Sequence, residues 1–272
     1  MNPSYLAKRW TGSEWDWAWL DPQPSPLVPA DVLDVRNWYL TLPTKDPATG
    51  IATNVFQPAL ATYSDQWFHA SVDGTGVIFT ANCGGAHTTT STHERSEFRE
   101  RYNDGVAQAA WSTSIGVHVM TIKGAVLALS PAKPETVFGQ IHDASTYVMT
   151  LIAVESSGTV QIVYDLLGSR MAAHLDDNYT LGTPYEVTVT VDSDVLTIHY
   201  NGTLIDTQAL IDTGCYFKAG DYTQSNTENY GDAPDAYART VITELDVSHT
   251  PYDSVDPGGT VTSSGCGTGY AT

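Results

Sequence analysis

Alternation of apolar and polar residues is the feature that most constrains the fold of this chain. Residues 185–191 (YEVTVTV) and 195–202 (VLTIHYNG) alternate on either side of an Asp-Ser-Asp turn. Residues 146–154 and 159–167 flank a Ser-Ser-Gly turn in the same way. Because successive side chains of a strand point to opposite faces, each pair predicts a β-hairpin with one face turned to a core.

Further strands are predicted at residues 76–82, 117–129 and 239–249, and the best candidate for a helix is the short segment 29–38. Many short strands with turns about every 8–12 residues are typical of a two-layer β-structure. We therefore predict an all-β fold, a jelly-roll sandwich of two antiparallel sheets.

Three parts can be distinguished along the 272 residues. Residues 31–250 carry the strand pattern and are long enough for one large all-β domain. Residues 1–30 are a Trp- and Pro-rich extension that contains four of the seven tryptophans. We expect these rings to pack on the main domain, and a strip that stacks on sugars is the alternative. Residues 251–272 are rich in Gly, Ser and Thr, which predicts a tail.

The charge balance excludes several partners. Lys and Arg total 12 against 31 Asp and Glu, a formal net charge of −19, which argues against nucleic acids and anionic membranes. No apolar run approaches the roughly 18 residues of a membrane helix. The first residues lack an apolar signal-peptide core, so the chain is either cytosolic or has lost a signal. We expect a secreted monomer. Three cysteines allow one disulfide in three pairings: Cys83, Cys215 and Cys266.

Three segments have a polar face that stands out in so acidic a chain. In HERSEFRE (93–100), Arg95, Glu97 and Arg99 would share one face of a strand while Phe98 points to the other. In FGQIHD (138–143), Gln140 and His142 share a face. In YFKAGDYTQ (216–224) the polar face carries four residues, opposite Phe217 and Ala219: Tyr216, Lys218, Tyr222 and Gln224.

Each of these segments has a structural interpretation when it is taken alone. Arg95, Glu97 and Arg99 would form a solvated salt-bridge ladder, His142 would be a structural histidine, and the tyrosines would pack at a rim. Taken together, the segments predict one sheet with a basic, donor-rich face that binds an anion.

RSEFRE, QIH and YFKAGDYTQ resemble the three signature strands of the alginate lyases of polysaccharide lyase family 7, and NWYLTLPT (37–44) resembles their opening strand. The order and separations agree over roughly residues 31–250. The resemblance implies a concave substrate-binding sheet, an anionic uronate polysaccharide (alginate) as partner, and no cofactor or metal. One departure is Asp221, where the family usually has an apolar residue facing the core, and we expect a β-bulge at Gly220.

The reaction that the resemblance implies is β-elimination at a 4-O-linked uronate of alginate. A proton leaves C5, the bond from C4 to the glycosidic oxygen breaks, and a 4,5-unsaturated sugar remains. Removal of the C5 proton would place a second negative charge beside the carboxylate. The site must therefore neutralise the carboxylate, supply a base at C5 and supply an acid at O4.

Four residues are implied as catalytic. Arg95 and Gln140 would neutralise the carboxylate, helped by His142. Tyr222 would protonate O4, and on a mannuronate it would also remove the C5 proton. On a guluronate the C5 hydrogen lies opposite O4, so His142 would be the base. A free phenol titrates at about pH 10. A basic role for Tyr222 therefore needs nearby cations such as Lys218, which favour the phenolate.

The resemblance also implies residues that bind neighbouring sugars or order the site. Glu97 would orient the two arginines. Within the family, an Ile between the Gln and the His accompanies activity on guluronate-containing blocks, and Ile141 is that residue. We therefore expect activity on such blocks. Endolytic cleavage is a separate expectation, and the sequence leaves exolytic cleavage open. The expected substrate-binding residues are Glu97, Arg99, Lys218, Gln224 and Tyr216.

Two other classes compete with the lyase. A glycoside hydrolase on the same sandwich would use a carboxylate pair such as Glu244 and Asp246, but the expected third carboxylate is replaced by His249. A carbohydrate-binding module would need no His and Tyr beside the arginines. His87 and His93 are the remaining metal candidates, and their spacing matches no common ligand pattern.

Overall fold

The fold is built almost entirely from β-strands, as the sequence predicts. The computed structural model describes residues 5–10, 15–20 and 27–251. Its helices are short turns: η1 (Pro29–Asp31), η2 (Ala59–Thr62) and α1 (Thr227–Tyr230). The helix candidate at 29–38 thus contains only one 3-10 turn. In the described ranges, no helix has the length and apolar character that crossing a membrane requires.

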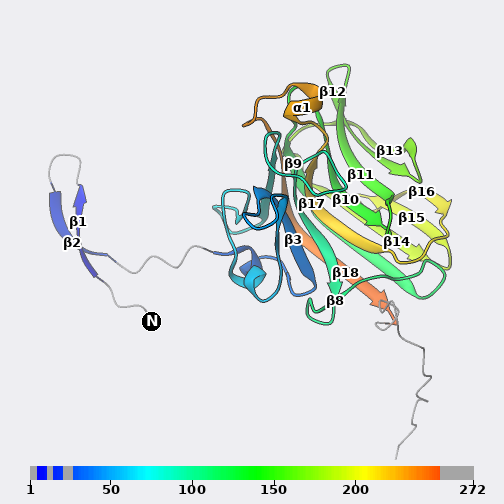
Figure 1. Cartoon of the computed structure of the whole chain (residues 1–272), viewed down its shortest axis with the longest axis horizontal. Helices are drawn as coiled ribbons and strands as arrows, with labels where there is room; N and C mark the ends of the chain where they lie inside the picture. The colour runs from blue at the N-terminus through cyan, green and yellow to red at the C-terminus, as the bar shows by residue number, and fades with distance from the viewer. Residues whose placement is uncertain (1–4, 11–14, 21–26, 252–272) are drawn as a thin grey trace, which may run out of the picture.

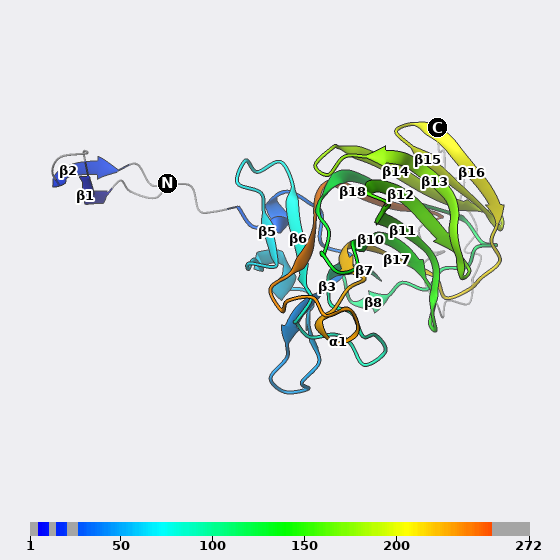
Figure 2. The ribbon, with the colours of Figure 1, turned by 90° about the horizontal axis from the view of Figure 1, so that it is seen from above.

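Two antiparallel sheets form the layers of a jelly-roll sandwich (Figures 1 and 2). Among the described residues, the larger sheet has nine strands, with β8 (Ala107–Gln108) paired to β7 and the others in the order β13 (Ser169–Tyr179), β12 (Thr159–Leu166), β11 (Tyr147–Ser156), β10 (Glu135–His142), β17 (Tyr216–Thr223), β7 (Arg95–Tyr102), β3 (Trp38–Lys45) and β4 (Ala52–Val55).

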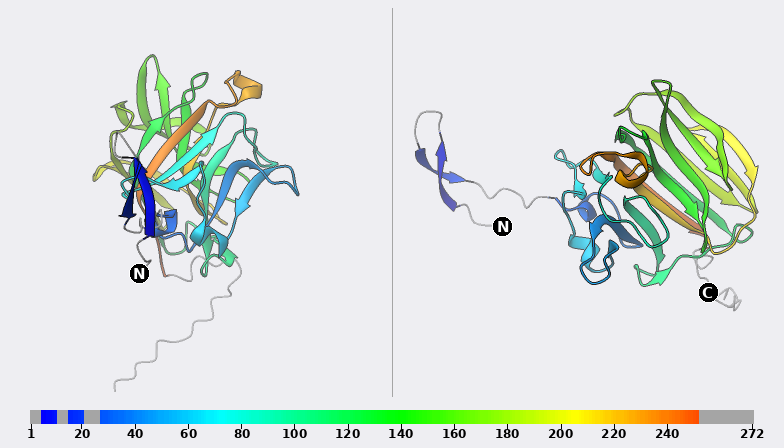
Figure 3. Two further views of the ribbon diagram at one scale, coloured as in Figure 1. Left: turned by 90° about the vertical axis from the view of Figure 1, so that its left-hand side faces the viewer. Right: turned by 45° about the horizontal axis from the view of Figure 1, so that its top comes forward.

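The smaller sheet covers the other side of the core. Within the same described ranges it has seven strands, in the order β16 (Thr203–Ala209), β15 (Val195–Tyr200), β14 (Tyr185–Asp192), β9 (Val117–Ala128), β18 (Tyr237–Thr250), β6 (Val77–Asn82) and β5 (Phe68–Ala70). Figure 3 shows the long strands of both sheets side by side. The predicted fold class is confirmed.

The predicted hairpins form with the predicted turns. β14 pairs with β15 around Ser193 and Asp194, whose φ angles are 51° and 62°. β11 pairs with β12 around Ser157 and Gly158, whose φ angles are 55° and 83°. Two successive residues with positive φ give a turn whose twist matches that of the flanking strands, which explains the choice of Ser, Asp and Gly there.

The core between the sheets holds the arginine-bearing strand in place through Phe98. The ring of Phe98 is fully buried and packs against Trp38, Phe68 and Phe79 at centroid distances of 5.5, 5.3 and 5.1 Å. Phe68 and Phe79 belong to the smaller sheet, so this cluster joins the two layers. Truncation of such a ring costs on the order of 3–5 kcal/mol.

Strand β17 contains the expected bulge at Gly220. In the pairing with β10, Gly220 and Asp221 together face the single residue Phe138. Gly220 has a φ of 144°, and a Cβ at this position would lie 2.5 Å from the carbonyl oxygen of Ser96. Only glycine fits this close approach between neighbouring strands.

Asp221 places a carboxyl group inside the core. Its two oxygens accept hydrogen bonds from Thr136 Oγ1 at 2.9 Å and from the backbone N–H of Ala81 at 3.2 Å. Because the group is fully buried, its pKa is raised well above the ordinary value. The folded protein therefore retains this proton at a pH where an exposed aspartate has lost it.

Outside the sandwich, β1 (Tyr5–Trp10) and β2 (Trp15–Leu20) pair as an antiparallel hairpin. The side chains of residues 1–26 and the tail at 252–272 lie outside the described part of the chain, so the packing of the tryptophans stays a prediction. Cys83 and Cys215 are buried and free, which removes one of the three disulfide pairings. Cys266 lies outside the described residues.

Replacing Asp221 by Asn should stabilise the protein increasingly as the pH rises. Unfolded Asp loses its proton at about pH 4, whereas Asp221 in the folded protein keeps its proton to a higher pH. Wild type therefore loses stability as the pH rises from the pKa of the unfolded state to that of the folded state. Asn does not titrate. Chemical denaturation at pH 4 and pH 8 gives the free energy of unfolding of Asp221→Asn relative to wild type. This relative stability should be higher at pH 8 than at pH 4. A difference independent of pH would contradict the raised pKa.

Candidate active site

The three strands with polar faces are neighbours in the larger sheet, in the order β10, β17, β7. Their outer faces form the floor of a groove of about 490 Å³, walled by residues 88–91 of the β6–β7 connection and 144–147 of the β10–β11 turn. The prediction of one sheet with one polar face is confirmed. The predicted site residues that line the groove are Arg95, Arg99, Gln140, His142, Tyr216, Lys218 and Tyr222.

Glu97 is the centre of this cluster, and its side chain is only 2% exposed. The carboxylate accepts hydrogen bonds from Arg95 Nη1 at 3.0 Å, from Lys218 Nζ and from Gln140 Nε2. Burial by itself raises the pKa of Glu97, but the charges of Lys218 and Arg95 outweigh it and hold the pKa below its ordinary value. Glu97 is therefore a carboxylate that holds three donors in fixed positions.

The arginines differ in their contacts. Arg95 lies 3.8 Å above the ring of Tyr222, and Arg99 lies 3.9 Å above the ring of Tyr216. Among the described residues no hydrogen bond or ion pair joins Arg99 to Glu97, so the prediction that Glu97 orients both arginines is wrong for Arg99, which stacks on a tyrosine instead. In each guanidinium the Nε atom is buried without a partner in the described part of the chain. Unpaired buried donors are costly, and both Nε atoms are shielded from solvent.

His142 is held as a neutral imidazole. Its Nδ1 lies 2.7 Å from the backbone oxygen of Asp143 and 3.0 Å from the hydroxyl of Tyr216. A carbonyl oxygen only accepts, so Nδ1 carries the hydrogen and Nε2 keeps its lone pair. Burial lowers the pKa of His142, which keeps the ring neutral near neutral pH. Burial raises the pKa of Tyr216 to about 12, so Tyr216 supports His142 as a neutral phenol.

Ser91 contacts Tyr222 and was not found from the sequence. The two hydroxyl oxygens are 2.9 Å apart. Ser91 Oγ also accepts from the backbone N–H of His93 at 3.0 Å and donates to the backbone oxygen of His93 at 3.1 Å. Since its only proton goes to a carbonyl, Ser91 accepts from the hydroxyl of Tyr222. Ser91 lies in a connection without periodicity, and the Ser/Thr-rich run at 88–92 was the only signal.

Gln224 is not part of the groove. Its side-chain amide donates to the backbone oxygens of Tyr222 at 3.2 Å and Thr223 at 3.3 Å. The carboxylates that a hydrolase would need are exposed on β18 in the other sheet, where Glu244 pairs with Lys123 at 3.2 Å. In the described ranges no group of three His, Cys, Asp or Glu side chains is placed to hold a metal ion, and this includes His87 and His93.

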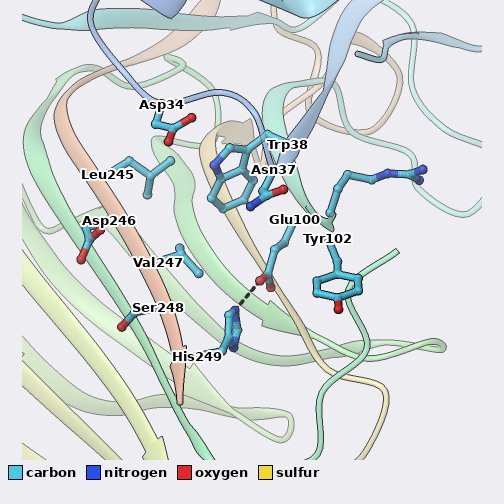
Figure 4. Close-up of a pocket in the computed structure, with 11 residues that line it drawn as sticks. Asp34, Asn37, Trp38, Glu100, Tyr102, Leu245, Asp246, Val247, Ser248 and His249 are labelled. Atoms are coloured by element: carbon cyan, nitrogen blue, oxygen red, sulfur yellow. Dashed lines mark hydrogen bonds and ion pairs between the residues drawn. The ribbon is translucent and has the colours of Figure 1, made fainter. Parts of the chain in front are cut away.

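A second pocket of about 260 Å³ opens at the end of the sandwich, between β7 and β18 (Figure 4). Figure 4 shows Leu245 and Val247 of β18 on one side and Trp38 on the other. His249 Nε2 lies 2.6 Å from Glu100 Oε1 in this pocket. None of the predicted site residues lines it, and its polar pair ties the two sheets together.

The fold and the groove define a carbohydrate-active β-sandwich whose cationic, donor-rich floor fits a chain of acidic sugars. A family model described as alginate lyase matches residues 33–249. The chain therefore belongs to the alginate lyase family, and its activity is that of an alginate lyase of polysaccharide lyase family 7. A comparison with curated protein sequences gave no match.

Three solved structures illustrate the likeness. Alginate lyase AlgAT5 from polysaccharide lyase family 7 is 39% identical with a TM-score of 0.77, over 82% of this chain and 99% of that one. The alginate lyase from Corynebacterium sp. is 31% identical with a TM-score of 0.76, over 83% and 100%. The alginate lyase from Pseudomonas aeruginosa is 25% identical with a TM-score of 0.68, over 79% and 99%.

Lys218 should make the binding of alginate depend on pH. Burial, with the nearby charge of Arg95, lowers the pKa of Lys218 to about 8 although Glu97 opposes this shift. Above that pH the groove loses a positive charge, so the KM for alginate should rise. Initial rates between about pH 6.5 and 9.5 measure this step. Lys218→Met should have a raised KM already at pH 7 and no step near pH 8. A step that persists in the variant would belong to another group.

Proposed function

We propose that this alginate lyase cleaves guluronate-containing blocks internally, with His142 as the base at C5 and Tyr222 as the acid at O4. The observation that carries the proposal is that both side chains line the groove that also contains the donors held by Glu97.

Neutralisation of the uronate carboxylate is assigned to Arg95 and Gln140. Arg95 donates from Nη1 to Glu97, and among the described residues its Nη2 makes no hydrogen bond. Gln140 uses one amide hydrogen on Glu97 and has a second. Donors fixed before the substrate arrives stabilise the developing charge without reorganisation. The second negative charge that forms on loss of the C5 proton is then spread over these donors.

Proton transfer follows from the protonation states. Nε2 of His142 accepts the C5 proton, the C–H electron pair forms the C4=C5 bond, and the C4–O4 bond breaks. Tyr222 gives its proton to the departing O4. Ser91, which accepts from Tyr222 in the resting site, positions that proton before transfer. His142 ends protonated and Tyr222 ends as a phenolate, so a proton exchange with water restores the site.

The preference for guluronate rests on Ile141 and on this division of base and acid between two residues. Guluronate has its C5 hydrogen opposite O4, so it needs two groups, whereas mannuronate can use Tyr222 for both transfers. Internal cleavage is proposed because the groove is walled along its sides by 88–91 and 144–147, while its floor continues across the strands. We also propose that the protein acts outside the cell, where a polymeric substrate is accessible.

The test compares guluronate-rich with mannuronate-rich alginate by following the ultraviolet absorbance of the new C4=C5 bond. Tyr222→Phe should lower turnover on both polymers by about 10²–10⁴-fold, because both routes need it at O4. His142→Asn should harm guluronate turnover more than any mannuronate turnover. All activity should persist in excess chelator, since Arg95 and Gln140 neutralise the carboxylate.

Circular dichroism must show that each variant is folded. A folded Tyr222→Phe with near-normal turnover would overturn the assignment of the acid. New reducing ends without ultraviolet absorbance would show hydrolysis instead of elimination.

A further inference from the structure

Three buried side chains form a hydrogen-bonded triad that joins the two sheets at the end of the sandwich. His118 of β9 and His249 of β18 are paired directly across their strands, and their Nδ1 atoms lie 2.7 Å apart. His249 Nε2 lies 2.6 Å from Oε1 of Glu100 on β7 (Figure 4). The side chains of His249 and Glu100 are 5% and 3% exposed, and His118 is fully buried. This buried triad connects the smaller sheet to the strand that carries Arg95 and Arg99.

The contacts of the buried triad require three hydrogens. His118 Nε2 lies 3.0 Å from the backbone oxygen of Ser112 and 2.8 Å from that of Ile115. A carbonyl oxygen only accepts, so this nitrogen carries a hydrogen. The contact between the two histidines and the contact between His249 and Glu100 each need one more. Two neutral imidazoles and a carboxylate supply only two hydrogens, so the triad holds one extra proton.

The extra proton is best placed on His249. Burial, together with the charge of His249, lowers the pKa of His118, which leaves that ring neutral. Oε2 of Glu100 accepts from the backbone N–H of Phe217 at 2.8 Å and from Trp111 Nε1 at 3.3 Å, and such donors favour the carboxylate. His249 is then an imidazolium between a neutral imidazole and a carboxylate.

Aromatic rings cover the buried triad. The ring of Trp111 stacks on His118 at a centroid distance of 4.3 Å, and the ring of Phe217 lies 6.0 Å from His249. In such surroundings the attraction between His249 and Glu100 is poorly screened.

Other titratable groups approach the buried triad without sharing its proton. Within the described ranges they are Cys215, which feels the charge of Glu100, and four residues that line the pocket beyond His249: Asp34, Arg101, Tyr102 and Asp246. Asp34 and Asp246 are exposed to water, and Arg101 donates to two backbone oxygens of the following turn. Burial raises the pKa of Cys215 to about 12, so it is a neutral thiol. Glu100 is therefore the main partner of the proton.

Glu100 also fixes the start of β17, the strand that carries Tyr216 and Lys218. The register of β17 on β7 runs from Lys218 to Tyr222, and Phe217 comes directly before it. There the N–H of Phe217 donates to the side chain of Glu100. Tyr216 and Lys218 flank Phe217 and line the groove, so a shift of Glu100 acts on both.

We infer that the shared proton of the buried triad positions the start of β17, and with it Tyr216 and Lys218, for the reaction. None of the triad residues lines the groove, so they are positioning residues that act through β17. Loss of the proton leaves two lone pairs facing each other across 2.6 or 2.7 Å, and one contact must open. The inference rests on the proposed function, because it takes the groove residues to act as proposed there.

Glu100→Gln removes the extra proton and keeps the hydrogen bonds, since the amide oxygen accepts from Phe217 and the amide N–H donates to a neutral His249. Folded wild type holds a proton that an unfolded histidine, which titrates at about pH 6.5, has lost at pH 8. Wild type therefore loses stability as the pH rises, and the variant does not. In chemical denaturation, the unfolding constant of wild type should rise relative to that of the variant by about 7- to 10-fold from pH 7 to pH 8.

Glu155→Gln is the matched control, because it removes the same charge from the surface, and it should leave this ratio unchanged. Nitrogen-15 NMR of histidine-labelled wild type detects the proton without any change at Glu100, because both ring nitrogens of an imidazolium carry hydrogen. We expect one imidazolium at pH 8, assigned to His249 by its loss in His249→Asn. An unfolding ratio that does not change with pH, or a neutral His249 at pH 8, would overturn the inference.

Initial rates on alginate test the positioning. Over the pH range in which NMR shows loss of the His249 proton, kcat should fall in wild type and hold in Glu100→Gln, while the KM step of Lys218 near about pH 8 remains in both. Glu100→Met removes the acceptor for Phe217, and the folded variant should lose about 10-fold in kcat at pH 7, which Glu100→Gln should restore.

A kcat that falls equally in wild type and Glu100→Gln would show that the triad has a structural role only, and would overturn the positioning. If wild type produces no C4=C5 absorbance from any alginate, the proposed function fails. The denaturation and NMR experiments use no substrate, so they decide separately whether the triad holds its proton.

Discussion

The ion pair and hydrogen bonds around the buried carboxylate of Glu97 determine the geometry of the groove. Arg95, Lys218 and Gln140 come from three different strands, and each donates to this one group. Without it, two cations would lie buried side by side, and removing one partner of a buried pair typically costs about 3–5 kcal/mol. Glu97 uses only some of the N–H groups of Arg95 and Gln140. It therefore orders the site and also fixes the remaining donors where they can bind an anion.

The local charge of the groove opposes the charge of the whole protein. Arg95 and Lys218 pair with one carboxylate, Glu97, and a third cation, Arg99, lies opposite Lys218, in a chain of net charge −19. Burial strengthens the electrostatic interactions of these charges, because they are poorly screened by salt and water. Burial also lowers the pKa of Lys218 to about 8. Recognition of an anionic polymer therefore depends on a small desolvated cluster, while the acidic surface contributes long-range repulsion.

Period-two alternation predicted the sandwich, the hairpins and the shared polar face, because it reports directly which face of a strand is buried. The departure at Asp221 also predicted the bulge at Gly220. Contacts that depend on tertiary placement could not be predicted in this way. Ser91 lies in an aperiodic connection, and Gln224 continues the polar pattern of β17 but turns its amide to its own backbone. Stacking of Arg99 on Tyr216 likewise depends on how two strands meet.

Glu97→Gln is the most direct test of the central claim that a buried carboxylate orders the site. The substitution keeps the shape of the side chain and makes the groove more positive by one charge. If order matters, kcat/KM for alginate should fall by about 100-fold or more, with the fold unchanged by circular dichroism. If simple attraction of the polyanion were enough, the more positive variant would be as active as wild type or more active, and that result would contradict the account.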